Sequence, residues 1–192
     1  MVEVCIGTFH GPGGPLQVVT TELGVVAAEW HPNGDAVLGR VLRRLGALDV
    51  VQARPAGRPA GRAAELLAEA TPIIEALLAG KDAPAARLPV DLADRPAFDQ
   101  RVLAAVRDVG WGQIASYGEI ARRVGAPRAA RAVGGALGRN PIVLLIPCHR
   151  IIASDGTLGG YGGDGWVDRA QALERKRALL AREGVTVRIR DR

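Results

Sequence analysis

The chain has 192 residues, of which 48% are hydrophobic and 4% aromatic, and its formal net charge is +5. These values are typical of a folded protein with aliphatic cores, large enough for one sizeable domain or two small ones. The start lacks the basic and long apolar regions of a secretory signal, and the apolar run at 142–146 is too short to cross a membrane. With two cysteines only, the chain is therefore expected in the cytoplasm, without a membrane partner.

The positive charge is confined to the second half of the chain. Residues 1–90 carry eight basic and nine acidic side chains, whereas residues 91–192 carry 17 basic and 11 acidic ones. The segment 120–154 contains six arginines and no acidic residue. An uninterrupted basic stretch of this kind favours a polyanionic partner, most simply nucleic acid. The alternative is an ordinary solvated surface, because 23 of the 25 basic residues in the whole chain are arginine.

The first half of the chain is predicted to form a small layer of strands and helices. The runs 16–21 and 25–30 have β-rich composition and are spaced as a hairpin. Helical periodicity follows over 38–48 and again over 63–78. The proline-rich segment 81–96 is the best candidate for a domain boundary.

We therefore predict an N-terminal domain over residues 1–90 and a C-terminal domain over residues 91–192. The second domain is expected to begin with a helix that starts at Pro96. Ser116 and Glu119 have the S-x-x-E spacing of a capping box, so a further short helix should begin at this serine.

A basic helix is predicted next, over residues 127–137. Pro127 suits its first position, and Arg128 and Arg131, three residues apart, would share one face. The residues between and after these arginines are mostly alanine and glycine, which would let a duplex approach closely. Together with the preceding helix and its glycine turn, this gives a helix-turn-helix outline, which many other helical hairpins share.

A candidate nucleophile follows a predicted strand over 142–146, in the sequence Pro-Cys-His-Arg at 147–150. The chain has only Cys5 and Cys148, far apart in sequence, so neither a disulfide framework nor a four-cysteine zinc site is expected. A lone cysteine beside a histidine is a candidate activated nucleophile, and a buried inert cysteine is the alternative. Neighbours in a strand point to opposite faces, so Cys148 and His149 can cooperate only if the chain bends at the proline.

The remaining C-terminal part is predicted to contain a glycine-rich loop over 154–165 and a helix over 168–183. Gly184 should end this helix, and a short strand over 185–189 is expected after it.

Several motifs of one known family occur in this half of the chain, in the family's order. They are SYGEIA at 116–121, RAVGGA at 131–136, Asn140-Pro141, PCHR at 147–150, Tyr161 and the segment 176–184. On these motifs, which span residues 96–184, the chain resembles the O6-alkylguanine-DNA alkyltransferases. The resemblance implies an α+β fold: a small N-terminal α/β domain that is ribonuclease H-like, then a mainly helical, winged-helix-type DNA-binding domain that carries the active site.

The resemblance also implies an activity. Members of the family are DNA repair proteins that transfer the alkyl group of O6-alkylguanine, with O4-alkylthymine as a second candidate substrate, irreversibly to their own cysteine, here Cys148. The base is flipped out of the duplex, and each protein molecule reacts once. The implied partner is double-stranded DNA containing O6-alkylguanine, no cofactor is needed, and a monomer is expected. Some members bind zinc in the N-terminal domain; this chain has Cys5, His10 and His31 but lacks a second cysteine there, so no metal is expected.

Three other functions are alternatives to this one. A non-catalytic protein of the same fold that only recognises alkyl lesions would lack the reactive cysteine, so Cys148 argues against it. A helix-turn-helix regulator would not need the Pro-Cys-His-Arg sequence and would bind one DNA sequence tightly. A Cys-His hydrolase would turn over repeatedly on ester substrates.

Four residues match the family's catalytic positions. Cys148 matches the nucleophile, and His149 and Glu183 match the pair that holds its thiolate. Asn140 matches a hinge asparagine that ties the turn after the recognition helix to the active-site loop. Without the resemblance, Glu183 would be interpreted as an ordinary carboxylate at a helix end.

Eight further residues match positions that contact the DNA or the flipped base. Arg131 matches an arginine finger that fills the space of the flipped guanine, and Tyr117 matches a tyrosine that rotates the nucleotide and bonds the base. The remaining six are Arg128 for a phosphate, Leu137 and Val143 for an apolar wall, Ile151 for the base amino group, and Tyr161 and Gly162 for the pocket lining.

Overall fold

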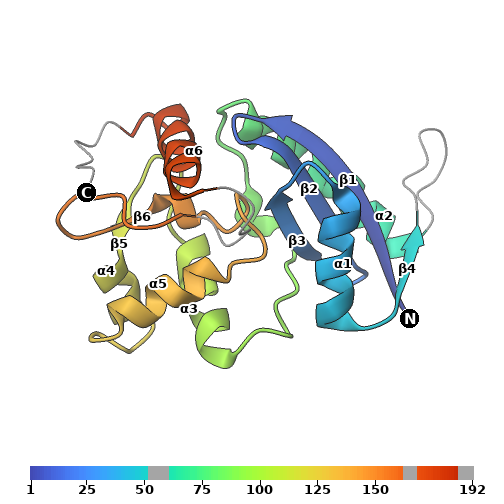
Figure 1. The fold of residues 1–192 in the computed structure, drawn as a ribbon, viewed down its shortest axis with the longest axis horizontal. Coiled ribbons are helices and arrows are strands. Elements are labelled where there is room, and N and C mark those ends of the chain that lie inside the picture. The colour runs from blue at the N-terminus through green and yellow to red at the C-terminus, as the bar shows by residue number, and fades with distance from the viewer. Residues whose placement is uncertain (52–60, 162–167, 186–192) are drawn as a thin grey trace. The chain divides into compact units, whose positions relative to one another are not determined.

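The computed structural model describes residues 1–51, 61–161 and 168–185, and Figure 1 shows its fold. It combines helices and strands, in agreement with the expected α+β class. The chain folds into two compact units, which are described separately below. None of the helices in the described ranges is both long and apolar enough to cross a membrane.

The division into units follows packing rather than the predicted boundary alone. The first unit contains Met1–Asp94 and Pro141–Leu145, and the second contains Arg95–Asn140 and the chain from Ile146 onward. The segment Pro141–Leu145 belongs to the first unit because its backbone pairs with Ala28. The Ala28 N–H donates to the Pro141 carbonyl (2.8 Å), and the Val143 N–H donates to the Ala28 carbonyl (2.9 Å).

The first unit is built on a four-stranded sheet of order β3-β2-β1-β4. The three strands β1, β2 and β3 are antiparallel neighbours, whereas β4 pairs parallel to β1. The predicted hairpin is therefore present, and two strands that the sequence did not single out extend it on one side. Their bounds are β1 Val2–Gly11, β2 Gly14–Thr20, β3 Val25–Trp30 and β4 Leu48–Val51.

Two helices, α1 (Gly34–Leu45) and α2 (Gly61–Leu78), lie on opposite faces of this sheet (Figure 1). Alternate residues of β1 serve the two faces, as the period of a strand requires. Val4 packs in a buried cluster with α1, whereas Gly7 lies against Leu67 of α2. The first helix begins four residues before the predicted start, because the Asn33 side chain accepts hydrogen bonds from its first turn.

The second unit contains four α-helices, a 3₁₀ helix and a two-stranded parallel sheet among its described residues. The capping box is confirmed: the Ser116 hydroxyl accepts from the Glu119 N–H, and the Glu119 carboxylate accepts from the Ser116 N–H. The bounds of the elements are α3 Ala97–Arg107, β5 Ala115–Ser116, α4 Tyr117–Arg123, α5 Ala130–Gly138, η2 Cys148–Arg150, β6 Ile151–Ile152 and α6 Arg169–Arg182.

Two sequence-based predictions for this region are wrong. Helix α5 begins at Ala130 rather than at Pro127, because the Ala129 N–H still bonds to the Ala126 carbonyl in a turn. Arg128 therefore lies before the helix and does not share a helical face with Arg131. The strand predicted over 142–146 is also absent, since Leu144 has a φ of +71°, which interrupts any extended run.

The C-terminal helix agrees with its prediction to within a residue at each end. Asp168 caps α6 by accepting from the Gln171 N–H, and Gly184 ends it with a φ of +73°. Most of the strand predicted over 185–189 lies outside the described residues.

Candidate active site

Cys148 opens a turn of 3₁₀ helix, and this turn supplies the bend that the sequence required. Pro147 has φ −79° and ψ 61°, and the Cys148 N–H donates to the Ile146 carbonyl at 2.7 Å. In the 3₁₀ turn the side chains of Cys148 and His149 leave the backbone in different directions. Cys148 lines a pocket, whereas His149 is fully buried against Glu183.

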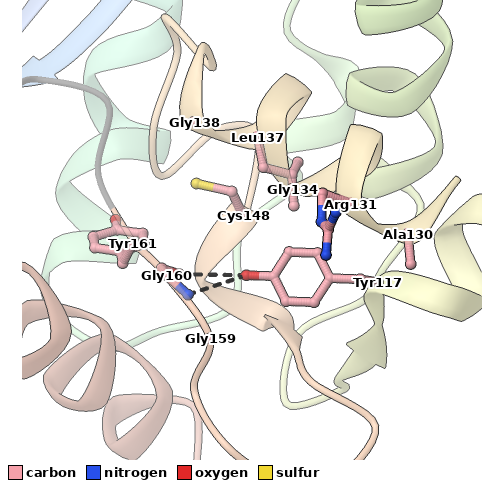
Figure 2. A pocket seen from close by; sticks show the side chains of 10 residues that line it. All are labelled: Tyr117, Ala130, Arg131, Gly134, Leu137, Gly138, Cys148, Gly159, Gly160 and Tyr161. Atoms are coloured by element: carbon pink, nitrogen blue, oxygen red, sulfur yellow. Dashed lines mark hydrogen bonds between the residues drawn. The ribbon is translucent and has the colours of Figure 1, made fainter. Parts of the chain in front are cut away.

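The pocket has a volume of about 400 Å³ and is lined only by residues of the second unit. Its wall comes from the start of α4, one side of α5, the 3₁₀ turn and the loop before residue 162, as Figure 2 shows. The lining residues are Tyr117, Ala130, Arg131, Gly134, Leu137, Gly138, Cys148, Gly159, Gly160 and Tyr161. A space of this size, with one thiol in its wall, can hold a planar ring of the size of a nucleobase.

Tyr117 stands in the pocket wall because the capping box fixes the start of α4 directly before it. Its hydroxyl lies 3.5 Å from the Gly160 carbonyl and 3.4 Å from the Gly160 N–H, which donates to it (dashed lines in Figure 2). Burial raises the pKa of this phenol above its ordinary value, so Tyr117 remains protonated at neutral pH. It can therefore donate a hydrogen bond to a bound ligand.

The close approach of Tyr117 to the loop depends on Gly159, which yields a stability prediction. Gly159 has a φ of +70°, and a Cβ there would lie 2.8 Å from the Tyr117 hydroxyl oxygen. Gly159→Ala should lower the free energy of unfolding by about 1–3 kcal/mol, as a strained backbone and a displaced ring predict. Chemical denaturation measures it, with Gly160→Ala as the matched control, because a Cβ at Gly160 meets nothing within 4 Å. Equal losses of stability in the two variants would contradict the importance of the close approach between Gly159 and Tyr117.

Behind Cys148, His149 and Glu183 form a buried pair. The His149 Nε2 atom lies 2.7 Å from Glu183 Oε1, and the two side chains are 0% and 3% exposed. Glu183 is ionised: burial alone would raise its pKa, but hydrogen bonds from His149 and Arg150 outweigh burial and lower it. Since a carboxylate only accepts, Nε2 carries the proton, and Nδ1 keeps its lone pair.

His149 is a neutral imidazole that can accept a proton. Burial lowers its pKa below the ordinary value, and the hydrogen bond with Glu183 opposes this effect without cancelling it. Its Nδ1 atom is buried and has no hydrogen-bond partner among the described residues. A buried nitrogen with a free lone pair, next to the cysteine in the chain, is the atom expected of a general base.

Asn140 closes the loop that precedes the cysteine. It is buried, and its Nδ2 donates to the Ile146 carbonyl at 3.1 Å. This bond joins the turn after α5 to Ile146, two residues before Cys148. Asn140 and Ile146 both belong to the second unit and flank the segment Pro141–Leu145, which belongs to the first. The bond thus connects this turn to the loop before Cys148, and the hinge role of Asn140 stays a prediction.

The other candidate residues are only partly brought together. Arg131, Leu137 and Tyr161 line the pocket, whereas Arg128 is exposed in the turn before α5 and Val143 belongs to the first unit. Neither of these two lines the pocket. Ile151 is buried in β6, and its carbonyl, expected to face the base, accepts from Lys176 at 2.5 Å. Gly162 lies outside the described residues.

Two buried cations at this site were not predicted, namely Arg150 and Lys176. Arg150 binds Glu183 through two nitrogens, and Lys176 donates to the carbonyls of Ile151, Leu158 and Gly160 at 2.5, 2.7 and 3.0 Å. Lys176 could have been found from its spacing, because it stands three and four residues before the apolar Leu179 and Leu180 of the same helix. A lysine on the buried face of a helix requires acceptors.

Comparison with known proteins gives a consistent result. The family model "6-O-methylguanine DNA methyltransferase, DNA binding domain" matches residues 97–185. A methylated-DNA–protein-cysteine methyltransferase of Haemophilus influenzae is 47% identical over 89 residues, which are 46% of this chain and 45% of that protein. The chain thus matches about half the length of this relative. The protein of the same name from Cricetulus griseus is 40% identical over 203 residues, covering 98% of this chain and 87% of its own.

Solved structures agree over most of the chain. The O6-methylguanine methyltransferase of Mycobacterium tuberculosis superposes with a TM-score of 0.68 at 31% identity, over 95% of this chain and 93% of that one. A crystal structure of the M. tuberculosis protein in complex with DNA gives a TM-score of 0.66 at 31% identity, over 94% and 92%. The archaeal protein from Pyrococcus kodakaraensis, at 23% identity and a TM-score of 0.61, is similar in fold.

Proposed function

Since this chain belongs to the methylated-DNA–protein-cysteine methyltransferase family, we propose that it repairs O6-alkylguanine in DNA by moving the alkyl group irreversibly to Cys148. The observation that carries this proposal is the position of Cys148, in the wall of a base-sized pocket and beside a buried histidine–carboxylate pair. A single-use alkyl acceptor needs one nucleophilic sulfur in a pocket that admits the alkylated base, and Cys148 in this wall would meet that need.

The transfer requires the thiolate, which His149 generates. The Cys148 thiol gives its proton to His149 Nδ1, directly or through a water, and the imidazolium is balanced by ionised Glu183. The sulfur then attacks the alkyl carbon, the bond between that carbon and O6 breaks, and a thioether forms. The electron pair of the broken bond stays on guanine, where a hydrogen bond from Tyr117 would stabilise the developing charge. No step regenerates the thiol, so each molecule reacts once.

Access to the pocket requires that the base leave the duplex. Arg131 is exposed at the pocket, on a helix whose neighbouring residues are small, and would fill the space of the extruded guanine. Arg128, exposed in the turn before this helix, would contact a phosphate. The DNA complex of the M. tuberculosis relative supports DNA as the partner, and that this DNA is double-stranded is part of the proposal. The winged-helix character of the second unit and the ribonuclease H-like character of the first are part of the same proposal.

Replacement of Arg131 and of Arg128 by alanine should therefore have different effects, the first on the rate of alkyl transfer and the second on the affinity for DNA. Arg131→Ala should slow reaction with an O6-methylguanine duplex about tenfold to a hundredfold. The free-energy cost of unstacking the base, a few kcal/mol, would no longer be offset by the inserted arginine side chain. The reaction of this variant with free O6-benzylguanine should change little, since a free base needs no extrusion. Arg128→Ala should instead weaken binding to any duplex. The slope of the logarithm of the binding constant against the logarithm of the salt concentration should become shallower by about one. An equal loss on duplex and free base would contradict the role of Arg131.

The test of the proposed function is a count of transferred label. A duplex with radiolabelled O6-methylguanine is incubated in excess with the protein, and the label on protein is measured. One methyl per protein molecule, and none in Cys148→Ala, is expected. Label that stays on the DNA would favour the lesion-recognition alternative, and release of more than one methyl per molecule would favour a hydrolase. Binding that prefers one DNA sequence over the lesion would favour a regulator.

A further inference from the structure

Arg150 is a buried cation of the site that the mechanism above does not use. Its Nε donates to Glu183 Oε2 at 2.8 Å and its Nη2 to Glu183 Oε1 at 3.0 Å, which forms a two-pronged ion pair. Its Nη1 donates to the Val109 carbonyl at 2.6 Å. The guanidinium carbon lies 5.7 Å from the centre of the Trp111 ring, so this ring covers its face.

Glu183 is held by four hydrogen bonds in all. Oε1 accepts from His149 and Arg150, and Oε2 accepts from Arg150 and from the Gly112 N–H at 3.2 Å. A guanidinium that binds a carboxylate through two nitrogens fixes the plane of the carboxylate, so the Glu183 carboxylate cannot rotate away from the imidazole. The position of His149 is therefore set by Arg150 as much as by Glu183.

The charges of the cluster have a further consequence. An ionised buried carboxylate alone would favour the imidazolium strongly, whereas one neutralised by a guanidinium favours it much less. The other charged group against His149 is Lys176 of α6, which also acts on Cys148, and Tyr117 of α4 faces Cys148 as a neutral phenol. Two buried cations thus stand against one carboxylate, and this excess of positive charge holds His149 in its neutral form.

We infer that Arg150, covered by Trp111, is a positioning residue of the reaction: it fixes Glu183, neutralises its charge and so keeps His149 a neutral base. The inference rests on the proposed function for its meaning, but it concerns the protonation of His149 and can be tested without DNA. Val109 and Gly112 hold the guanidinium and the carboxylate from the loop between α3 and β5, so this loop belongs to the reactive site although it does not line the pocket.

The test uses the full chain and follows the titration of the His149 imidazole by NMR as a function of pH. Removal of the buried positive charge leaves Glu183 without its neutralising partner, so the imidazole keeps its proton to higher pH. Arg150→Gln should therefore move the midpoint of the titration upward by about one unit or more. Arg150→Lys keeps the charge, so its midpoint should stay near that of the parent.

Trp111→Leu provides a second route that leaves the ion pair in place. Exposure of the guanidinium to water screens its charge, so the midpoint should shift upward by less than in Arg150→Gln. This variant decides the matter if Arg150→Gln does not fold, as judged by circular dichroism. A midpoint that is unchanged in Arg150→Gln or, where that variant is unfolded, in Trp111→Leu would overturn the inference. So would an equal shift in the glutamine and lysine variants, which would show a purely structural role. If His149 titrates as predicted in the parent and the variants but the parent takes no label from DNA, the proposed function fails and this inference stands.

Discussion

Replacement of Glu183 by glutamine is expected to slow alkyl transfer about 10²- to 10⁴-fold, the range found when a general base loses its orientation. The amide has one acceptor oxygen in place of two, and its NH2 group would face a donor, either Arg150 or the Gly112 N–H. His149 would then be free to adopt the other tautomer, in which Nδ1 carries the proton and cannot take one from Cys148. Single-turnover kinetics on an O6-methylguanine duplex measures the rate.

The same substitution should also destabilise the fold. It leaves the Arg150 charge without its carboxylate at a site where the two side chains are 9% and 3% exposed, a loss of about 3–5 kcal/mol. Glu174→Gln is the matched control, because Glu174 lies on α6, the helix that Glu183 follows, is 72% exposed and pairs with Arg177 at the surface. It should change neither rate nor stability. A Glu183→Gln protein that reacts within about twofold of the parent would refute the assigned role of the carboxylate.

Lys176→Met is expected to have the second largest effect. The methionine fills the space but leaves the buried carbonyls of Ile151, Leu158 and Gly160 without their shared donor. Gly160 and its neighbours form one wall of the pocket, and the Gly160 carbonyl also contacts the Tyr117 hydroxyl. Loss of this anchor should lower the rate at least about tenfold, or about 1.4 kcal/mol. Reaction rates on the alkylated duplex, compared at a temperature where both proteins are folded, measure it.

The pH dependence of the parent gives an independent check on Lys176. Burial lowers the pKa of Lys176 from 10.5 to about 8, so the ammonium is present below this pH and is lost above it. A neutral amine has two N–H bonds for three carbonyls, so the transfer rate should fall as the pH rises through about 8. The unfolded chain still holds this proton up to its pKa of 10.5, so stability should rise with pH over the same interval. Rate and stability should thus move in opposite directions, and neither change should occur in Lys176→Met.

Several elements were predictable because their signals are local. The capping box at Ser116 depends on two residues three apart, and the end of α6 depends on a glycine, so both are correct in the structure. The cysteine and its neighbouring histidine were found from their sequence order alone. The match of Glu183 required the family motifs, since nothing in a helix-end glutamate shows that it meets a residue 34 positions earlier.

Other features depend on contacts between distant segments, which a single sequence does not show. The run 142–146 has strand-like composition, but Leu144 adopts a left-handed conformation and only Ile142 pairs with Ala28. Packing therefore assigns Val143 to the first unit rather than to the pocket wall. Arg150 was noticed as part of a basic stretch and of the Pro-Cys-His-Arg motif, but no role was predicted for it, because its partners come from the C-cap of α6 and from the loop after α3.

The most direct test of alkyl transfer to Cys148 is the location of the transferred group. After reaction with a duplex containing O6-methylguanine, the protein is digested and its peptides are analysed by mass spectrometry, and the DNA is analysed for guanine. We expect one added methyl group, located on Cys148, together with unmodified guanine in the strand and no methyl on Cys5. Repaired DNA with an unmodified Cys148, or a methyl group on any other residue, would contradict the proposed reaction.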